Sequence, residues 1–283
     1  MTIANNKKRA AALAAAALAA VALLLGACTT YGTRQSTSLA LDRILAGDQR
    51  SEENRARDRY RHPKATLLFF GIRPQMSVLE VWPEPGWYTE VLAPLLADAG
   101  HYYAGVIAAD PNSRYVTQRL EAYRQKLAAR PDVYGHVTVV TFPLDGSDVV
   151  PPGTLDMILT FRNIHNWMAH DEAAAAFATM FRALKPGGVL GVVEHRGNPA
   201  VPQDPKARSG YVNEDYAIRL IEAAGFRLEA SSQVNANPKD TKDYERGVWT
   251  LPPTYELGAQ DRGKYAAIGE SDRFTLKFVK PAR

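Results

Sequence analysis

The stretch Met76–Ala93, MSVLEVWPEPGWYTEVLA, decides the fold. It begins with Ser77–Val81, a short and mostly apolar run with one acid, Glu80, near its end. Proline and glycine residues then interrupt the chain, and apolar side chains follow with helical spacing. This order predicts a strand, a tight turn and a helix, the first unit of a parallel α/β sheet. Such sheets bind ligands at the carboxyl ends of their strands, so the turn Trp82–Gly86 is the first candidate site.

Strand and helix patterns alternate along the rest of the chain, which predicts a doubly wound, mostly parallel sheet. The expected strands are His101–Ile107, Val137–Phe142, Leu155–Phe161, Val189–Val193 and Phe226–Val234, with Phe274–Val279 as an edge strand. The expected helices are Pro63–Phe70, Arg114–Ala129, Glu172–Leu184 and Glu214–Ala224. The mixed charges of Asp48–His62 predict a solvated helical face. We expect these N-terminal helices to pack on the same core.

The composition is that of an ordinary globular protein, with 283 residues of which 46% are hydrophobic and 23% charged. The net charge of +4 comes mostly from the first 27 residues, which hold three basic residues and no acids. Without them, 31 basic and 30 acidic residues remain. Because the chain after residue 27 is nearly neutral, its charge gives no reason to expect nucleic acid as a partner.

The N-terminus has the pattern of a bacterial lipoprotein signal peptide. Lys7–Arg9 is basic, Ala10–Leu25 is apolar but shorter than the ~20 residues of a spanning helix, and small residues follow. Leu25–Cys28 resembles a lipoprotein box, and Cys28 is the only cysteine of the chain. We expect a signal peptide at 1–27, lipidation of Cys28, a tether at 28–38 and one domain at 39–283. This predicts a periplasmic, lipid-anchored protein, with outer-membrane sorting as the weaker inference. An ordinary secretory signal and an uncleaved anchor helix are the alternatives.

The turn after the first strand does not suit a dinucleotide. A pyrophosphate needs close backbone approach and several N–H donors, as in G-x-G-x-x-G. Here Pro83 and Pro85 lack that donor, and Trp82 and Glu84 stand where glycine is needed. A cationic adenosyl ligand is a better candidate, because an acid at a strand end can meet its ammonium group.

Several stretches resemble the class I S-adenosylmethionine-dependent methyltransferases. VLEVWPEPGWYTEVLAP is similar to their motif I, Leu155–Leu159 to their fourth-strand motif and Leu184–Leu190 to the turn before their fifth strand. More narrowly, TFRNIHNW, VVEHR, NPKDTKDYERGVWTLPP and GESDRFTLKF resemble a bacterial group of exported predicted methyltransferases. The resemblance covers about Leu39 to Pro281. It implies a Rossmann-like, seven-stranded methyltransferase sheet, S-adenosylmethionine as cofactor and a small-molecule or protein methyl acceptor.

The same resemblance implies a set of cofactor-binding residues. Glu80 approaches the methionine amino group, Gly86 lets the backbone come near the cofactor, and Asp145 lies near the adenine. Asp110 is the candidate acid for the ribose hydroxyls. The expected cofactor-binding residues are therefore Glu80, Trp82, Gly86, Asp110, Asp145 and Arg162. For Arg162, steering of an acidic acceptor and a plain surface role are the alternatives.

Polar side chains that follow the fourth and fifth strands are the candidate catalytic residues. Asn163 and His165 follow the fourth strand, and Glu194 and His195 end the fifth. A base is needed where the acceptor must lose a proton, and His165 is the first candidate for it. A structural role for either histidine, and an ion pair of Glu194 with Arg196, stay open. We expect no metal, because Glu194 and His195 form only an adjacent pair.

Two functions are compatible with these residues. In the first, the chain is a lipid-anchored methyltransferase. In the second, it is a non-catalytic binding lipoprotein that keeps the methyltransferase fold while its degenerate cofactor turn has lost its role. Export favours the second, because the cofactor is made in the cytoplasm. The polar residues kept at the strand ends favour the first. The turn-rich segments around Asn237–Asp243 and Gly269–Arg273, with Trp249 between them, form either a lid or a plain hydrogen-bonded loop.

Overall fold

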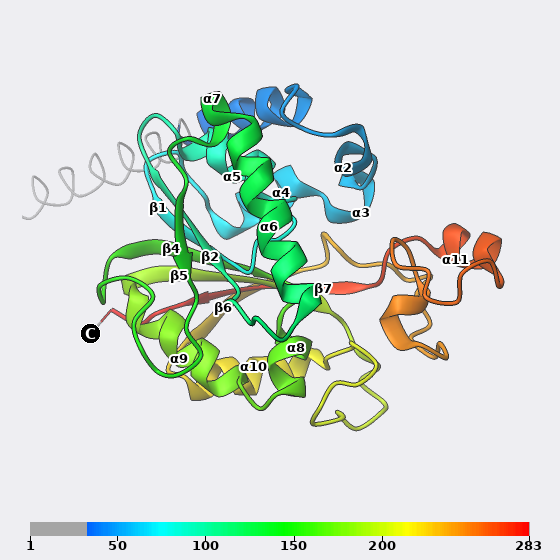
Figure 1. Ribbon diagram of the computed structural model, residues 1–283. Coiled ribbons are helices and arrows are strands. Elements are labelled where there is room, and N and C mark those ends of the chain that lie inside the picture. The colour runs from blue at the N-terminus through cyan, green and yellow to red at the C-terminus, as the bar shows by residue number, and fades with distance from the viewer. Residues whose placement is uncertain (1–32, 283) are drawn as a thin grey trace, which may run out of the picture.

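The strand β1, Ser77–Val81, lies inside a seven-stranded sheet in the computed structural model, which describes residues 33–282. The strand order is β3-β2-β1-β4-β5-β7-β6 (Figure 1). β1 to β5 run parallel, and β7 is antiparallel to both of its neighbours. The other strands are β2 His101–Val106, β3 Thr138–Thr141, β4 Leu155–Phe161, β5 Leu184–His195, β6 Arg227–Ser232 and β7 Arg273–Val279. The doubly wound, mostly parallel sheet predicted from the sequence is confirmed.

Helices cover both faces of the sheet (Figure 1). They are α2 Glu52–Ala56, α3 Asp58–Arg61, α4 Pro63–Phe70, α5 Thr89–Leu96, α6 Arg114–Ala129, α7 Pro131–Tyr134, α8 Ile164–Ala169, α9 Ala173–Ala183, α10 Glu214–Ala223, the 3-10 helix η1 Gly247–Thr250 and α11 Arg262–Ile268. Two buried clusters fill the spaces between the layers, one with α4 to α7 and the other with α8 to α10. The central strand β4 is apolar and buried along almost its whole length, as a parallel strand covered on both faces must be.

Three local predictions differ from the structure. β7 is an inner strand between β5 and β6, not an edge strand, and its side chains are mostly buried on both faces. The residues that follow β4, for which the sequence predicted no helix, form the short helix α8. Residues 33–46 are helical, so the described part of the expected tether 28–38 is not extended, and Thr37 is fully buried.

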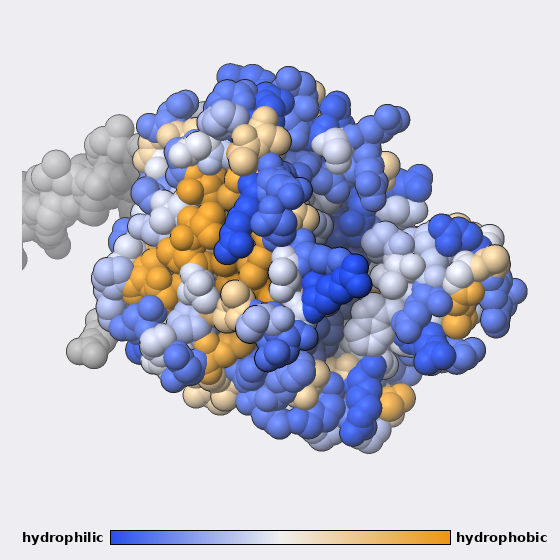
Figure 2. Space-filling view, in the orientation of Figure 1, coloured by the Kyte–Doolittle hydropathy of each residue, from blue (hydrophilic) through white to orange (hydrophobic). Residues whose placement is uncertain are grey.

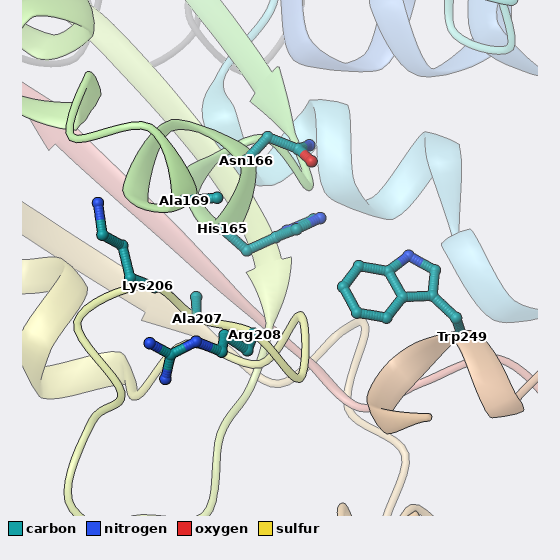
Figure 3. Close-up of a pocket in the computed structure, with 7 residues that line it drawn as sticks. All are labelled: His165, Asn166, Ala169, Lys206, Ala207, Arg208 and Trp249. Atoms are coloured by element: carbon teal, nitrogen blue, oxygen red, sulfur yellow. The ribbon is translucent and has the colours of Figure 1, made fainter. Parts of the chain in front are cut away.

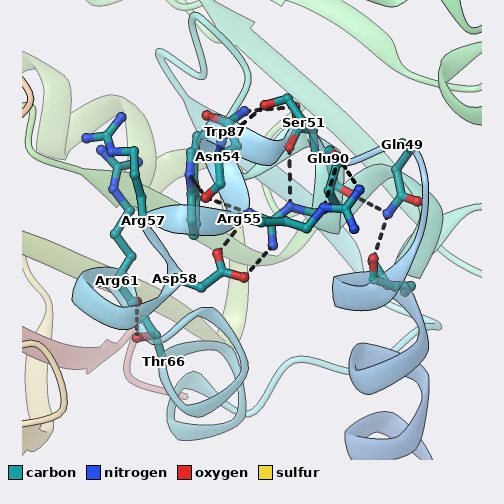
Figure 4. Close-up of polar contacts among 12 residues, drawn as sticks. Gln49, Ser51, Asn54, Arg55, Arg57, Asp58, Arg61, Thr66, Trp87 and Glu90 are labelled. Atoms are coloured by element: carbon teal, nitrogen blue, oxygen red, sulfur yellow. Dashed lines mark hydrogen bonds and ion pairs between the residues drawn. The ribbon is translucent and has the colours of Figure 1, made fainter.

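A buried arginine, Arg50, holds the N-terminal helices to the core. Figure 4 shows its partners Asp58, Glu90 and Trp87 at this junction. Arg50 is 1% exposed and donates hydrogen bonds to both carboxylate oxygens of Asp58, each at 2.9 Å. It also contacts Glu90 of α5, and its guanidinium lies over the ring of Trp87. The predicted solvated face of Asp48–His62 is confirmed only in part: Glu52, Glu53, Arg55 and Arg59 are exposed. Arg50 and Arg61 are buried, because they pair with the distant residues Glu90 and Glu270.

None of the helices in the described region is both long and apolar enough to cross a bilayer. The expected signal peptide and the lipidation site Cys28 lie outside the described residues.

Candidate active site

A cavity of about 780 Å³ lies at the carboxyl ends of β1, β2, β4 and β5, where the sequence placed the site. The start of the antiparallel strand β7 reaches the same end of the sheet. Trp249 of η1 and the prolines Pro252 and Pro253 form the opposite wall. Figure 2 shows the corresponding hollow between the main body and the lobe that carries α11. The volume is within the range of small-molecule and cofactor sites.

Glu80 lies in this cavity as a buried acid. It is 3% exposed, and its Oε2 accepts a hydrogen bond of 2.7 Å from the hydroxyl of Tyr102. Burial raises the pKa of Glu80 to about 8, and the nearby Glu84 acts in the same direction. A buried carboxyl group with one hydrogen bond from the protein has capacity for a second partner that carries positive charge.

The turn after β1 has the backbone shape that glycine normally provides. Trp82 has φ +51°, in the left-handed region that non-glycine residues rarely adopt. Its indole packs edge-on against Trp167 of α8, and its Nε1 is buried without a partner among the described residues. Trp82 also lines the cavity. The indole therefore occupies space near the turn and leaves one hydrogen-bond donor for a ligand.

Glu84, which the sequence marked only as a misfit, is the acid that reaches the end of β2. Its Oε1 accepts a hydrogen bond of 3.1 Å from Ile107 N, and its side chain is buried in the cavity wall. Burial raises its pKa. Asp110 lines the cavity as well, but it is exposed and binds Asn112 N in the turn before α6. The sequence found Asp110 from its position after the strand and missed Glu84, because only the folded turn brings Glu84 there.

Two of the expected cofactor residues do not line the cavity. Gly86 has φ +91°, and a Cβ built on it would lie 2.9 Å from Lys126 Cδ and 3.1 Å from Tyr123 Cε2 of α6. Its role in the structure is to let the turn pack against α6, so a bulky substitution there would disturb the fold. Asp145 is exposed and holds Ser147 by two hydrogen bonds, while its neighbour Leu144 faces the cavity.

His165 and Glu194 form a buried pair at the ends of β4 and β5. His165 Nδ1 lies 3.1 Å from Glu194 Oε1, which fixes the proton of the neutral imidazole on Nδ1. No described residue hydrogen-bonds to Nε2, and His165 lines the cavity. Figure 3 shows the ring extending from α8 towards Trp249. The arrangement leaves the Nε2 lone pair available to take a proton from a bound molecule.

Glu194 itself does not line the cavity and is completely buried. Its two oxygens also accept hydrogen bonds from the backbone N–H groups of Ile164, His165 and His195. The expected catalytic role for Glu194 is therefore corrected: it is a positioning residue that orients His165. Its expected alternative, an ion pair with Arg196, is also wrong, because Arg196 pairs with Glu214 and Asp272.

The remaining strand-end residues have more structural roles. Asn163 lines the cavity, but its Nδ2 donates hydrogen bonds to Val81 O at 2.9 Å and Thr160 Oγ1 at 3.1 Å. Only its carbonyl oxygen is left for a ligand. His195 Nδ1 lies 2.5 Å from Ser271 Oγ, and burial keeps the pKa of His195 well below its usual value. His195 is thus a neutral neighbour of His165, 5.4 Å away between ring centroids.

His165, Glu194 and His195 are also spaced as metal ligands, because one potential ligand atom from each lies within 4.8 Å of the others. The sequence showed Glu194 and His195 as an adjacent pair, but it did not show that His165 lies beside them. Every oxygen of Glu194 already accepts N–H groups, and a metal ion would have to displace the hydrogen bond from His165. The geometry fits an oriented base better than a metal site.

Three arginines line the cavity near these histidines, two of which the sequence assigned to a solvated face. Arg57 and Arg61 come from the N-terminal helices, and Arg273 begins β7. All three contact the buried Glu270, with Arg57 at 2.5 Å and Arg61 at 3.3 Å. Although burial opposes ionisation, these guanidinium groups together hold the pKa of Glu270 well below its usual value. No sequence pattern predicts this cluster, because Glu270 lies 213 residues from Arg57.

Replacing Glu270 by glutamine is expected to destabilise the fold by about 3–5 kcal/mol at pH 7, because the buried Arg61 and Arg273 and the partly buried Arg57 lose their counter-charge. Because the pKa of Glu270 is lowered in the folded protein, its contribution to stability is fully present above the ordinary glutamate pKa. The contribution is lost as the pH falls towards the lowered pKa of the folded protein. The difference in melting temperature between E270Q and the wild type should therefore shrink below about pH 4. In the control D42N, which removes an exposed pair with Lys64, the change should stay below about 1 kcal/mol. An E270Q melting temperature equal to that of the wild type at pH 7 would contradict the role of Glu270.

The chain has the fold of class I methyltransferases, as comparison with solved structures shows. A SAM-dependent methyltransferase from Aquifex aeolicus superposes with a TM-score of 0.53 at 18% identity, covering 80% of this chain and 93% of that chain. The geranyl diphosphate methyltransferase in complex with SAM gives 0.51 at 13% identity, with 78% and 85% covered. The [4+2]-cyclase SpnF gives 0.57 at 17% identity, with 84% and 85% covered. No family model matches the sequence, and no curated protein does. At these identities the likeness defines the fold, and the cyclase shows that this fold also carries other reactions.

Proposed function

We propose that the chain is an S-adenosylmethionine-dependent methyltransferase whose acceptor gives up a proton to His165. The observation that carries this proposal is the His165–Glu194 pair, which presents an oriented and unpartnered imidazole Nε2 to the cavity. The same cavity holds the buried acid Glu80 at the end of β1. On this proposal, His165 is the base on the acceptor side and Glu80 is the acid on the cofactor side.

The residues present fit the cofactor by their chemistry. Glu80 would meet the ammonium group, and its carboxylate has room for a charge-assisted hydrogen bond. Glu84 and Asp110 would meet the ribose hydroxyls, and Leu144 and Ile107 supply apolar surface. Trp82 Nε1 is the orphaned donor that a ligand atom would satisfy. Gly86 and Asp145 have no part in this site.

The bound cofactor supplies a methyl group on a sulfonium, ready for in-line displacement. The protein holds the acceptor in line and excludes water, which supplies most of the acceleration. Glu194 keeps the Nδ1 proton of His165 in place, so that Nε2 takes the proton of an acceptor hydroxyl, thiol or ammonium group. Trp249 covers the side of the cavity where this transfer takes place.

The competing function is binding without methyl transfer. It is favoured by Trp82, whose large side chain stands in the cofactor turn where such sites require glycine. The SpnF comparison shows the fold in an enzyme described as a cyclase.

The two functions are separated by calorimetric titration of the full chain, purified in detergent, with S-adenosylmethionine and S-adenosylhomocysteine. Micromolar affinity supports the methyltransferase, and a panel of small acceptors is then screened for release of S-adenosylhomocysteine. Absence of heat and of thermal stabilisation at millimolar ligand would contradict it and favour the binding protein.

We also propose that Cys28 carries the lipid that anchors the chain outside the cytoplasm. Thr29, rather than an aspartate, follows the cysteine, which favours sorting to the outer membrane. Support comes from the basic, apolar and small segments that precede Cys28.

In a bacterial host, the wild type should incorporate labelled palmitate and sediment with membranes, and C28S should do neither. The single cysteine makes this variant specific. Membrane association of C28S equal to that of the wild type would instead indicate an uncleaved anchor helix.

A further inference from the structure

Four arginines gather at one end of the cavity, although they come from three separate segments. Arg57 and Arg61 belong to the N-terminal helices, Arg162 follows β4, and Arg273 begins β7. Figure 4 shows Arg57 and Arg61 side by side. Arg61 and Arg273 are only 5% and 3% exposed. Packing this many guanidinium groups together costs energy unless anions compensate for them.

The protein supplies too few anions at this place. Arg57, Arg61 and Arg273 share the single carboxylate of Glu270. The side chain of Arg162 makes no hydrogen bond or ion pair with any residue of the described range 33–282. Glu194 uses both of its oxygens for N–H groups of α8 and β5. Burial lowers the pKa of Arg162 to about 10, and the nearby Arg273 acts in the same direction.

Donors that face this space are left without partners. Arg273 Nε is buried and unpaired among the described residues, while the terminal nitrogens of the same guanidinium bind Tyr60 O and Glu270. Buried donors are rarely left unsatisfied in a folded protein. An incoming oxyanion would accept from these groups and balance their charge.

We propose that Arg162 and Arg273 bind a carboxylate or phosphate group of the methyl acceptor, which makes the acceptor a small organic anion. The inference rests on the proposed function and deepens it by naming the acceptor class. Trp249 and Pro252, on the opposite wall, offer apolar surface to the rest of the acceptor.

The sheet order distinguishes this anion from the carboxylate of the cofactor. The cofactor turn follows β1, whereas Arg273 begins β7, which lies beyond β4 and β5 in the sheet. His195 pairs in register with Arg273, and its ring lies next to that of His165. Arg273 therefore belongs to the part of the cavity that holds the proposed base, and Arg162, which follows β4, lies between that part and Glu80.

The test uses the full chain in detergent, first titrated with S-adenosylhomocysteine and then, when saturated, with benzoate or inorganic phosphate at constant ionic strength. One of these probes should bind the wild type at millimolar concentration or below. R162Q should weaken that binding at least tenfold, because the unpaired guanidinium is removed. Its melting temperature should not fall, since no internal contact is lost. The control R219Q removes an exposed arginine of α10 that pairs with Asp215, and it should bind both ligands as the wild type does.

Two results would overturn the inference. In the first, neither probe binds the wild type, or the bound probe has equal affinity for R162Q. In the second, R162Q weakens the binding of S-adenosylhomocysteine tenfold but not that of 5′-methylthioadenosine, which lacks the amino-acid part. This result would mean that Arg162 binds the carboxylate of the cofactor. Failure of the proposed function is a different result, because the wild type would then not bind S-adenosylhomocysteine in the first titration.

Discussion

Replacing His165 by alanine is expected to slow methyl transfer by about a hundredfold to ten-thousandfold while the affinity for S-adenosylmethionine stays unchanged. The reason is geometric. None of the described residues hydrogen-bonds to His165 Nε2 in the cavity wall, and Nδ1 is held by Glu194. The measurement is the release of S-adenosylhomocysteine with the acceptor found in the screen, together with calorimetry of cofactor binding.

E194Q tests the same pair from the other side. Glutamine offers one oxygen where the carboxylate accepts from four N–H groups, so His165 loses its orientation and the fold loses about 1–3 kcal/mol. Because the two residues act as a unit, the double variant should be hardly slower than H165A alone. H170Q is the matched control, since His170 lines the cavity but is exposed. Full activity of H165A would show that the acceptor needs no base here.

The order of the elements could be predicted from the sequence because each depends on local pattern. The run Ser77–Val81, the turn after it and the helix behind it carry their own hydrophobic periods and breaks. β7 was misplaced because strand order is not a local property. Its alternation suits an edge strand as well as an inner one, and only the pairing with β5 and β6 decides between them.

The site could be predicted only as single residues. A position at or just after the carboxyl end of a strand was enough to select Glu80, Asn163, His165 and Glu194, because parallel strands end together. Which of them contact each other could not be read, so Glu194 was taken as catalytic although it lies behind His165. The arginines were missed for a similar reason. A charged side chain can be buried where an opposite charge lies beside it. For these arginines that charge is Glu270, which lies far along the chain.

Replacing Glu80 by glutamine is expected to stabilise the fold and, at the same time, to weaken the binding of the cofactor. Burial raises the pKa of Glu80 to about 8 in the folded protein, so ionising this group costs stability. In the wild type, the stability that the neutral Glu80 contributes is fully present below the ordinary glutamate pKa. This contribution is lost as the pH rises through 8. E80Q remains neutral, and Tyr102 can still donate to its oxygen. Its advantage should grow between pH 5 and 8 to about 3 kcal/mol, or ~6–12 °C in melting temperature.

The affinity for S-adenosylhomocysteine should fall in E80Q by about ten- to a hundredfold at pH 8, because the ammonium group loses a charged acceptor. The ratio of the two dissociation constants is the useful quantity, since ionisation of the ligand affects both proteins equally. This ratio should decrease towards pH 6, where the wild-type Glu80 is itself protonated. D145N is the control, because Asp145 lies outside the cavity and should change neither quantity. A destabilised E80Q would mean that Glu80 has a structural role, whereas a stabilised variant with unchanged affinity would place the ammonium group elsewhere. Gain of stability together with loss of binding is the combination expected of a buried acid that is kept for its ligand.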